Sequence, residues 1–420
     1  MSAVDLARLQ FAVTTSVHFL FVLLTLGLVT LVAITQTRFA ITGNPVFGRM
    51  ARFWGLLYVI NYAVGIASGL VMEFQFGLNW SGLSRLTGDV FGAPLALETL
   101  IAFVLESTFL GMWIFGWGRL PKGLHLALIW GVTLTAYLSA FWVMIANSFL
   151  QHPVGYALDG SGEARLTSFG ALLANPNLWF ALGHVLSAAA LTGGFFMAGV
   201  SAWHLLRRTK EVEFFRRSLR TGTFAAFFGT FFVIGFGYAQ FAPIGDNQPT
   251  KLASGDKLAD AQAAMVARYG PGDYAPPGWI HSALENMINL GNLLFLIAFV
   301  ALLLQIRDVL TRSRWLRPAL WVLVVTIPIP FVTAIGGWMV REVGRQPWVV
   351  YGVLKTSDAV SNLDAGTLRA SRLGFGGLLV ALALVDWWLI ARHARRGPGD
   401  EFLAIEPEPA TVGTFAAVSS

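Results

Sequence analysis

Nine long apolar segments dominate the pattern of hydrophobic and polar positions along the chain. They cover residues 10–36, 54–72, 94–116, 124–150, 178–206, 221–243, 279–306, 316–340 and 372–392. An α-helix needs roughly 20 residues to cross a bilayer core that is about 30 Å thick, and each segment is of about that length or longer. Polar stretches separate the segments. The pattern therefore predicts an all-α integral membrane protein with nine transmembrane helices.

Composition supports this class and narrows the chemistry. The 420 residues are 55% hydrophobic and 12% charged, which is outside the range of ordinary soluble domains. The first segment is longer than a signal-peptide core and lacks a cleavage motif, so it is predicted to stay as a helix. The chain has no cysteine, which excludes disulfides, thiolate zinc sites, iron–sulfur clusters and cysteine-attached haem. Any metal chemistry must use His, Met, Glu or Asp.

The basic residues predict how the chain crosses the membrane. Of the 29 Lys and Arg residues, 18 lie in the loops after the first, third, fifth and seventh predicted helices and in the C-terminal tail, and 11 lie on the other face. The positive-inside rule then predicts an outer N-terminus and a cytoplasmic C-terminus. Residues 1–396 form one predicted transmembrane domain with a long outer loop at 243–278, and the polar tail 397–420 is predicted to be disordered. Loop charges facing anionic lipid explain the net charge of +6 without nucleic acid.

Several polar residues inside the apolar segments share one depth. A helix rises about 1.5 Å per residue, so each can be placed relative to the membrane. The set that falls in the outer leaflet is His18, Glu98, Glu106, His184, Met287 and Glu342. Charged groups at membrane depth are costly, so they usually pair, face a cavity or hold a ligand. A shared depth is what a cofactor layer near the outer face requires.

The histidines and the methionine have two interpretations. A lone intramembrane His often only hydrogen-bonds across a helix interface, and a Met usually serves packing. In hydrocarbon, however, a neutral imidazole is a natural axial ligand of haem iron, and a thioether can complete a His/Met pair. His18, His184 and Met287 are therefore candidate haem ligands.

The carboxylates also have two interpretations. Glu98 and Glu106 are eight residues apart, so in an α-helix both project from nearly the same face. They suggest a proton relay, to which Ser139 in the next helix could contribute, or a protonated structural pair. Glu342 lies between Arg341 and Arg345 at the end of an apolar run. The three charged residues either form part of a site or serve as interfacial anchors in an aromatic belt with Trp338 and Trp348.

Four short strings carry a resemblance to a known family. They are Arg8-Leu9-Gln10-Phe11, Met72-Glu73-Phe74-Gln75-Phe76-Gly77, Phe91-Gly92-Ala93-Pro94-Leu95-Ala96 and Gly344-Arg345-Gln346-Pro347-Trp348. With them, the chain resembles subunit I of the cytochrome bd-type quinol oxidases along nearly its whole length. The resemblance implies the following roles: His184 and Met287 as ligands of a low-spin haem b; His18 and Glu342 as ligands at a high-spin haem b and a haem d, or a third haem b; Glu98, Glu106 and Ser139 in proton delivery; Arg345 and Trp338 beside the high-spin haems; and Lys251 and Asp256 in the quinol-binding loop.

The resemblance also implies an activity and partners. Membrane quinol, menaquinol or ubiquinol, would be oxidised at the outer face, and O2 would be reduced to water with generation of a membrane potential. Subunit II is the expected partner in a bacterial cytoplasmic membrane, with a small single-helix subunit as a further candidate and no nucleic acid.

Two departures from the family pattern keep alternatives open. Glu285 stands where the family commonly has an arginine, and Asp256 replaces a common glutamate. They favour a haem b quinone-linked conduit or sensor without oxygen reduction. A transporter that couples protons through the intramembrane carboxylates is a second alternative, and the lack of an inverted repeat argues against it.

Overall fold

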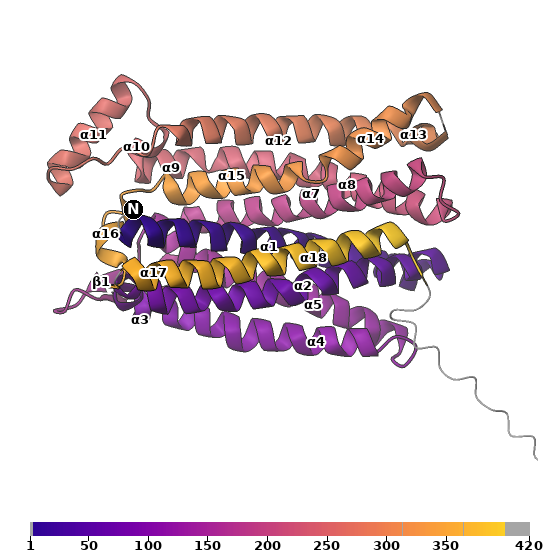
Figure 1. Ribbon diagram of the computed structural model, residues 1–420, viewed down its shortest axis with the longest axis horizontal. Helices are drawn as coiled ribbons and strands as arrows, with labels where there is room; N and C mark the ends of the chain where they lie inside the picture. Colours follow the sequence, from indigo (N-terminus) through magenta and orange to yellow (C-terminus); the bar gives the residue numbers. More distant parts are fainter. Residues whose placement is uncertain (1–2, 313, 364, 400–420) are drawn as a thin grey trace, which may run out of the picture.

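Long helices lie side by side in a bundle in the computed structural model, which describes residues 3–312, 314–363 and 365–399 (Figure 1). Within these residues, eight helical segments are long and apolar enough to cross a membrane. They are Val4–Thr42, Pro45–Asn79, Lys122–Gln151, Pro176–Leu206, Val212–Asn247, Trp279–Leu304, Arg317–Val343 and Gly366–Arg396. The predicted all-α membrane architecture is confirmed in this coarser form.

The elements follow one another along the chain with few strands. The helices are α1 (Ala3–Thr42), α2 (Pro45–Asn79), α3 (Ser81–Leu97), α4 (Val104–Phe115), α5 (Lys122–Gln151), α6 (Phe169–Leu173), α7 (Pro176–Leu206), α8 (Val212–Ala239), α9 (Phe241–Asn247), α10 (Pro249–Leu252), α11 (Asp256–Tyr269), α12 (Trp279–Leu304), α13 (Val309–Arg312), α14 (Arg317–Thr326), α15 (Ile329–Val343), α16 (Thr356–Ala359), α17 (Ala365–Ser371) and α18 (Gly377–Arg396). Single-turn elements are the π-helices η1 (Glu98–Phe103) and η4 (Arg372–Gly376) and the 3-10 helices η2 (Ile306–Asp308) and η3 (Arg314–Leu316). Two antiparallel hairpins pair β1 (Tyr156–Leu158) with β2 (Ala164–Leu166) and β3 (Trp348–Val350) with β4 (Leu354–Lys355).

The predicted spans 94–116 and 316–340 are interrupted. Residues 94–116 correspond to the end of α3, the π-helix η1 and the short apolar helix α4, so this segment is not among the eight. Residues 316–340 are divided into α14 and α15 around Pro328 and Pro330. Proline has no N–H to donate to the preceding turn, which accounts for the second break.

Local sequence signals set where helices begin. Asn44 precedes α2 and Asn175 precedes α7, and each side chain accepts a hydrogen bond from the backbone N–H two residues later. A proline follows each asparagine at the first helical position, where its missing N–H costs nothing. This Asn-Pro pair therefore starts both helices at the membrane edge.

Glycines let α7 pack closely between its neighbours. A Cβ atom on Gly27 of α1 would collide with the backbone of α7 at Ala189 and Gly193. One on Gly229 of α8 would meet the backbone of α7 at Leu191. Small residues at such crossings allow membrane helices to approach closely. As a result α7 lies recessed between α1 and α8.

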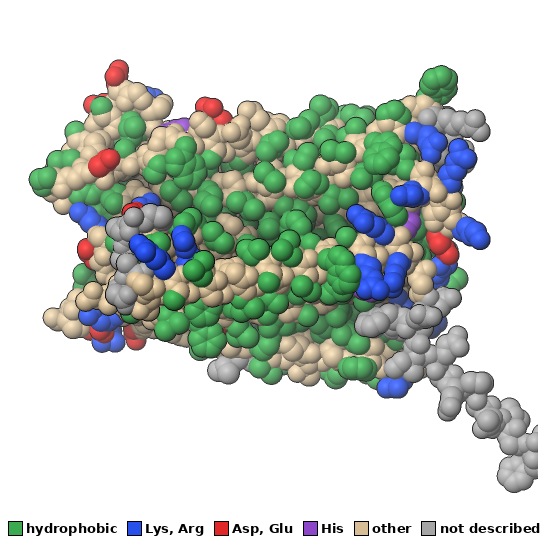
Figure 2. All heavy atoms as spheres, in the orientation of Figure 1, with side chains coloured by type: hydrophobic (Ala, Val, Ile, Leu, Met, Phe, Trp, Pro, Cys, Tyr) green, Lys and Arg blue, Asp and Glu red, His purple; other side chains and the backbone are tan. Residues whose placement is uncertain are grey.

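The two ends of the bundle differ. The end where α1 begins, here called the N side, carries both hairpins and the loop with α9, α10 and α11 (Figure 1). On the face shown in Figure 2, Lys and Arg side chains gather at the opposite end, here called the arginine-rich side. Of the tail predicted to be disordered, residues 400–420 lie outside the described residues.

Candidate functional site

Glu342 is the centre of a buried polar cluster on the N side. It ends α15 with 9% exposure. One carboxylate oxygen accepts hydrogen bonds from Asn147 Nδ2 at 2.9 Å and Gln151 Nε2 at 3.3 Å. The other accepts from Arg345 Nη2 at 2.7 Å, and the Arg345 side chain is itself buried. A buried carboxylate held by a guanidinium and two amides is stabilised in its ionised form.

The outer loop is hydrogen-bonded to the same cluster. Lys251 on α10 is 2% exposed, and its Nζ donates to the Arg341 carbonyl at 2.9 Å and to Gln151 Oε1 at 3.5 Å. Gln248 Nε2 donates to the backbone and side-chain oxygens of Gln151 at 2.8 and 3.0 Å. Burial, together with Arg341 and Arg345, holds the pKa of Lys251 well below its usual value. Gln151 thus connects the loop directly to Glu342.

Both intramembrane histidines are oriented through the same ring nitrogen. His184 Nδ1 lies 2.8 Å from the carbonyl oxygen of Val233 on α8, which can only accept, so Nδ1 carries the proton. His18 Nδ1 lies 2.8 Å from Ser68 Oγ, and that hydroxyl donates to the Gly65 carbonyl at 2.7 Å. Ser68 therefore accepts from His18 as well. In both rings the Nε2 lone pair is left available.

This arrangement fits a haem ligand. Among the described residues, Nε2 of neither histidine has a hydrogen-bond partner. Metal-binding histidines typically donate the other ring N–H to a protein acceptor, which fixes the tautomer. The described residues contain no group of three or more His, Asp or Glu side chains of the kind that holds a bare metal ion. Axial ligation of a macrocycle needs only one or two protein ligands.

Met287 lies on α12 and faces α15. A Cβ atom added at Gly337 would come within 2.6 Å of the Met287 sulfur, so the glycine makes room for the thioether. Glu285 and Asn289 beside it are exposed. His184 faces α8 instead, through the bond of its Nδ1 to Val233. The two candidate ligands of one haem therefore come from different helix interfaces.

The carboxylates Glu98 and Glu106 have different helices as neighbours. Ser139 Oγ on α5 donates to Glu98 at 2.6 Å, whereas the Tyr58 hydroxyl on α2 donates to the buried Glu106 at 3.3 Å. The expectation that both project from nearly the same face assumed an uninterrupted α-helix. The π-helix η1 lies between them and changes the angle per residue, so that assumption was wrong.

Three buried donors in and beside the cluster have no hydrogen-bond partner among the described residues. They are Arg341 Nη2, Arg345 Nη1 and Trp348 Nε1. Buried polar groups are normally hydrogen-bonded once a site holds its ligand, and guanidinium donors suit carboxylates best. A bound group that carries carboxylates, such as the propionates of haem, would satisfy them. Trp338 is close by on α15, with its ring 6.3 Å from that of Phe11 on α1.

The loop residue Asp256 lies away from this cluster. It is exposed in the first turn of α11, and the described residues show no hydrogen bond or ion pair between it and Lys251. An aromatic clamp holds α11: the ring of Tyr269, the last residue of α11, lies edge-on to Trp348 with centroids 5.0 Å apart, and the Tyr274 ring stacks on Trp348 with centroids 5.8 Å apart. Lys355 Nζ lies 5.7 Å from the Trp348 ring centre. The clamp joins the loop to the β3–β4 hairpin.

The structure adds residues that the sequence did not single out. Gln151 and Gln248 are buried and bridge segments that are 97 residues apart. Tyr58 is fully buried beside Glu106. The one local signal was that Asn147 and Gln151 are four residues apart at the end of a predicted helix, and so share a face.

Comparison with known proteins gives consistent matches over nearly the whole chain. Residues 6–270 and 267–398 match the profile of the family described as cytochrome bd terminal oxidase subunit I. The chain is 39% identical over 450 residues to cytochrome bd ubiquinol oxidase subunit 1 of Bacillus subtilis (strain 168), covering 94% of each chain. It is 32% identical over 509 residues to cytochrome bd-II ubiquinol oxidase subunit 1 of Escherichia coli (strain K12), covering 94% of this chain and 97% of the other. The solved structure of bd oxidase from Geobacillus thermodenitrificans superposes with a TM-score of 0.83 at 25% identity, covering 94% of this chain and 99% of that chain.

Proposed function

Because the chain belongs to the family of cytochrome bd terminal oxidase subunit I, we propose that it is the haem-bearing catalytic subunit of a respiratory quinol oxidase. It would oxidise membrane quinol on the N side and reduce O2 to water. The observation that carries the proposal is that both intramembrane histidines have Nδ1 bound to the protein and Nε2 available. A histidine inside an apolar helix, with Nδ1 hydrogen-bonded and Nε2 available, is suited to bind haem iron.

Each candidate ligand has a proposed place. His184 and Met287 would hold a low-spin haem b, and His18 and Glu342 would bind at a high-spin haem b and a haem d, or a third haem b. Glu342 has capacity left, since a carboxylate has about four lone-pair sites and three hydrogen bonds to it are seen. Haem groups, when bound, supply one-electron transfer and oxygen binding. The unpaired donors of Arg341 and Arg345 would hold propionates, with Trp338 beside them.

Two pairs of side chains, each a hydroxyl with a carboxyl, would hold and exchange protons. Ser139 hydrogen-bonds Glu98, and Tyr58 hydrogen-bonds Glu106, so each carboxyl has a hydroxyl with which to exchange a proton. Quinol would bind at the loop 243–278, where Lys251 lies beside the Glu342 cluster and Asp256 begins α11. Release of protons on the N side and uptake from the other side would generate a membrane potential.

The membrane arrangement follows from the same proposal. The segment α3–η1–α4 would be a ninth span, with the N-terminus outside and the tail in the cytoplasm, in a bacterial cytoplasmic membrane. Subunit II would be the partner, with a small single-helix subunit as a further candidate.

A haem b conduit or sensor is the second candidate. The exposed carboxylate of Glu285, two residues before Met287, is the observation that favours it. A negative charge there would stabilise oxidised iron and lower the potential of a neighbouring haem. Such a protein would take electrons from quinol but consume no oxygen.

Ligand variants test the haem assignment. In the purified complex, His184→Ala or Met287→Ala should abolish the low-spin band of the dithionite-reduced minus air-oxidised spectrum. His393→Ala, whose ring bonds within its own helix, and Met112→Ala, on an exposed position, are matched controls that should keep the band. Haem extraction identifies the haem types present. Unchanged spectra in the ligand variants would refute the assignment.

A further inference from the structure

The last membrane helix, α18, buries a carboxyl group that has no place in the site described above. Asp386 is 0% exposed, and among the described residues neither of its side-chain oxygens has a hydrogen-bond partner. Burying an ionised carboxylate without a partner is very costly, so the neutral acid, which carries a proton, is the form that fits this position. Acids inside membrane helices usually serve proton transfer or ligand binding. The O–H of the neutral acid still needs an acceptor.

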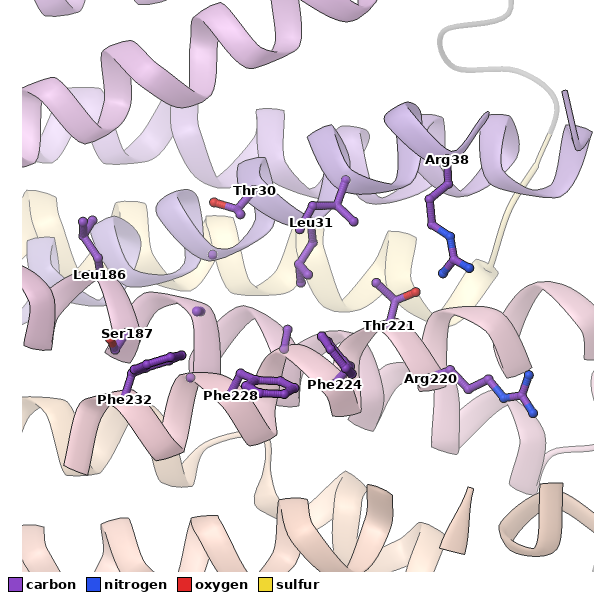
Figure 3. A pocket seen from close by; sticks show the side chains of 15 residues that line it. Thr30, Leu31, Arg38, Leu186, Ser187, Arg220, Thr221, Phe224, Phe228 and Phe232 are labelled. Atoms are coloured by element: carbon purple, nitrogen blue, oxygen red, sulfur yellow. The ribbon is translucent and has the colours of Figure 1, made fainter. Parts of the chain in front are cut away.

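The face of α18 that carries Asp386 packs against α2. Asp386, Ile390 and Ala394 are four residues apart and therefore share this face. Ile390 and Ala394 belong to the same hydrophobic cluster as Leu57 and Tyr58 of α2, and α18 runs along α1 and α2 in Figure 1. The surface groove between α1, α7 and α8 is a different feature, because no residue of α18 lines it (Figure 3). Asp386 thus faces the pair of helices α1 and α2.

Contacts near the arginine-rich side place Asp386 level with Asn61 of α2. His204 Nε2 donates to the Ala394 carbonyl at 2.7 Å. The His204 ring also stacks on a phenylalanine of α8, which packs against Phe53 of α2 with ring centroids 6.3 Å apart. Ala394 is therefore level with Phe53. The helices α18 and α2 run in opposite directions, so eight residues before Ala394 and eight residues after Phe53 lie Asp386 and Asn61 at one level.

Contacts on the N side give the same level independently. Gln10 Nε2 of α1 donates at 3.0 Å to Ser371 Oγ, at the end of α17. The helices α1 and α18 run in the same direction, so fifteen residues further along each lie Thr25 and Asp386. Asn61 Nδ2 donates to Thr25 Oγ1 and to a backbone carbonyl of α1, both at 2.8 Å. Both routes therefore bring Asp386 to Asn61.

Asn61 has the acceptor that Asp386 needs. Asn61 is 1% exposed, and its Oδ1 is buried without a hydrogen-bond partner among the described residues. An amide oxygen can only accept, and a neutral carboxyl group can donate. A hydrogen bond from Asp386 to Asn61, direct or through one water, satisfies both groups.

The helix α2 continues from Asn61 to Glu106. Tyr58 is one turn from Asn61, and its hydroxyl donates to Glu106 at 3.3 Å. Few other titratable groups lie near this level: Tyr62 of α2 pairs with a serine hydroxyl of α4 at 3.4 Å, and residues 21–29 of α1, 187–203 of α7 and 329–340 of α15 include none. Asp386 is thus the acid nearest to the α18 end of this polar series.

We propose that Asp386 holds a proton taken up from the arginine-rich side and passes it through Asn61 and Tyr58 to Glu106. The proton leaves the carboxyl group along these hydrogen bonds, and a proton from the aqueous phase replaces it. Asp386 is ten residues before Arg396 at the arginine-rich end, roughly 15 Å, but fifteen residues after Ser371 on the N side. The use of the proton rests on the proposed function, whereas the proton on Asp386 does not.

Infrared spectra of the resting, air-oxidised complex in H2O and in D2O test the proton on Asp386. The C=O stretch of a protonated carboxyl group moves to lower frequency on deuteration. Asp386→Asn should remove one such band, and Asp386→Glu should keep it at a changed frequency. The control Asp358→Asn, at an exposed aspartate on the N side, should leave the spectrum unchanged. In Asn61→Leu the band should move to higher frequency, because the carboxyl group loses its acceptor.

Oxygen consumption tests the delivery of that proton. Asp386→Asn should slow quinol-driven oxygen uptake about 100-fold, as loss of a proton-transfer group does. Anaerobic reduction of the haems by quinol should keep its rate, because it needs no proton from the arginine-rich side. Asp386→Glu should restore most of the oxygen uptake, and Asp358→Asn should match the wild type.

Each result decides the proposal. A band that survives in Asp386→Asn, or full oxygen uptake by that variant, would overturn it. If Asp386→Asn does not assemble, an unshifted band in Asn61→Leu would overturn the link instead. A wild type that consumes no oxygen would contradict the proposed function and with it the delivery to Glu106, while the infrared band would still report whether Asp386 holds a proton.

Discussion

At the scale of single residues, hydrogen bonds at the Nδ1 atoms orient the two intramembrane histidines. Ser68 accepts the Nδ1 proton of His18, and the Val233 carbonyl accepts that of His184. Gly69 and Gly237 lie against the ring edges, where a Cβ would come within 3.3 and 3.2 Å of Cε1. These neighbours fix the tautomer and leave little freedom for the ring to turn. They are as much a part of the proposed ligand set as the histidines themselves.

Ser68→Ala tests this positioning role. It removes the acceptor of His18 Nδ1 without changing a ligand, and loss of such a partner typically costs 10–100-fold in metal affinity or activity. We expect a shifted and weakened high-spin haem absorption, with the low-spin band retained. Ser201→Ala, a buried serine that bonds only within α7, should leave the spectrum unchanged. A fully wild-type spectrum in Ser68→Ala would contradict the role.

Gln151→Leu tests the connection between the loop and Glu342. The substitution removes the side-chain acceptor of Lys251 and Gln248 and one donor to Glu342. A hydrogen bond to a charged group contributes about 1.5–3 kcal/mol, so quinol oxidation should fall about 10–100-fold. The dithionite-reduced haem spectrum should persist. Gln305→Leu, at a buried glutamine on the other side of the membrane, is the matched control. Normal quinol kinetics in Gln151→Leu would refute the connection.

At the scale of elements, two segments attached to the bundle hold the proposed site. The helix α11 is fixed to the β3–β4 hairpin by the clamp, in which Tyr269 at the end of the helix and Tyr274 just after it pack against Trp348. The π-helix η1 is fixed to α5 by the bond between Glu98 and Ser139. The clamp lies in the loop outside the bundle, so α11 can be released without unfolding the bundle.

Trp348→Ala should release α11. Truncating a buried tryptophan costs about 3–5 kcal/mol, and cleavage of a loop follows the population of its open state. We expect trypsin to cut at Lys257 and Arg268 at least tenfold faster, measured by gel and mass spectrometry of the purified complex. Trp315→Ala, at a tryptophan that is 91% exposed, is the control. Equal cleavage rates in Trp348→Ala and the wild type would show that the clamp does not hold the loop.

Some helix boundaries could be predicted from the sequence, and others could not. The predicted span 178–206 is observed as Pro176–Leu206, because an Asn-Pro start and a continuous apolar run mark it locally. The span 94–116 is interrupted by η1, a change of helical period that hydropathy does not register. The same change separates the neighbours of Glu98 and Glu106. Prolines in 316–340 carry a local signal for the break between α14 and α15.

At the scale of the whole molecule, the two ends of the bundle have different chemistry. The N side carries the buried Glu342 cluster and the loop, and the other side carries most of the basic residues. The membrane depth of the candidate ligands was predicted from helix rise. The hydrogen bonds of Gln151 did not, because its partners Glu342 and Gln248 are 191 and 97 residues away in sequence. Pattern analysis places residues at a depth, whereas only the fold brings specific side chains together.

The natural absence of cysteine makes the predicted orientation easy to test. Ser161→Cys puts one thiol in the β1–β2 turn on the N side, and Lys210→Cys puts one in the loop between α7 and α8. On intact cells a membrane-impermeant maleimide should label the Ser161 variant at least tenfold more than the Lys210 variant, because the N side is predicted to be outside. After lysis both should react. The reverse pattern would invert the topology.

Quinol-driven oxygen uptake by the purified complex tests the central claim most directly. A reduced quinol is added to the wild-type enzyme in an oxygen-electrode cell while haem absorption is recorded. The proposed function predicts rapid reduction of the haem bands together with steady oxygen consumption, at two quinols per O2. Haem reduction by quinol without oxygen consumption would contradict it and identify an electron conduit instead.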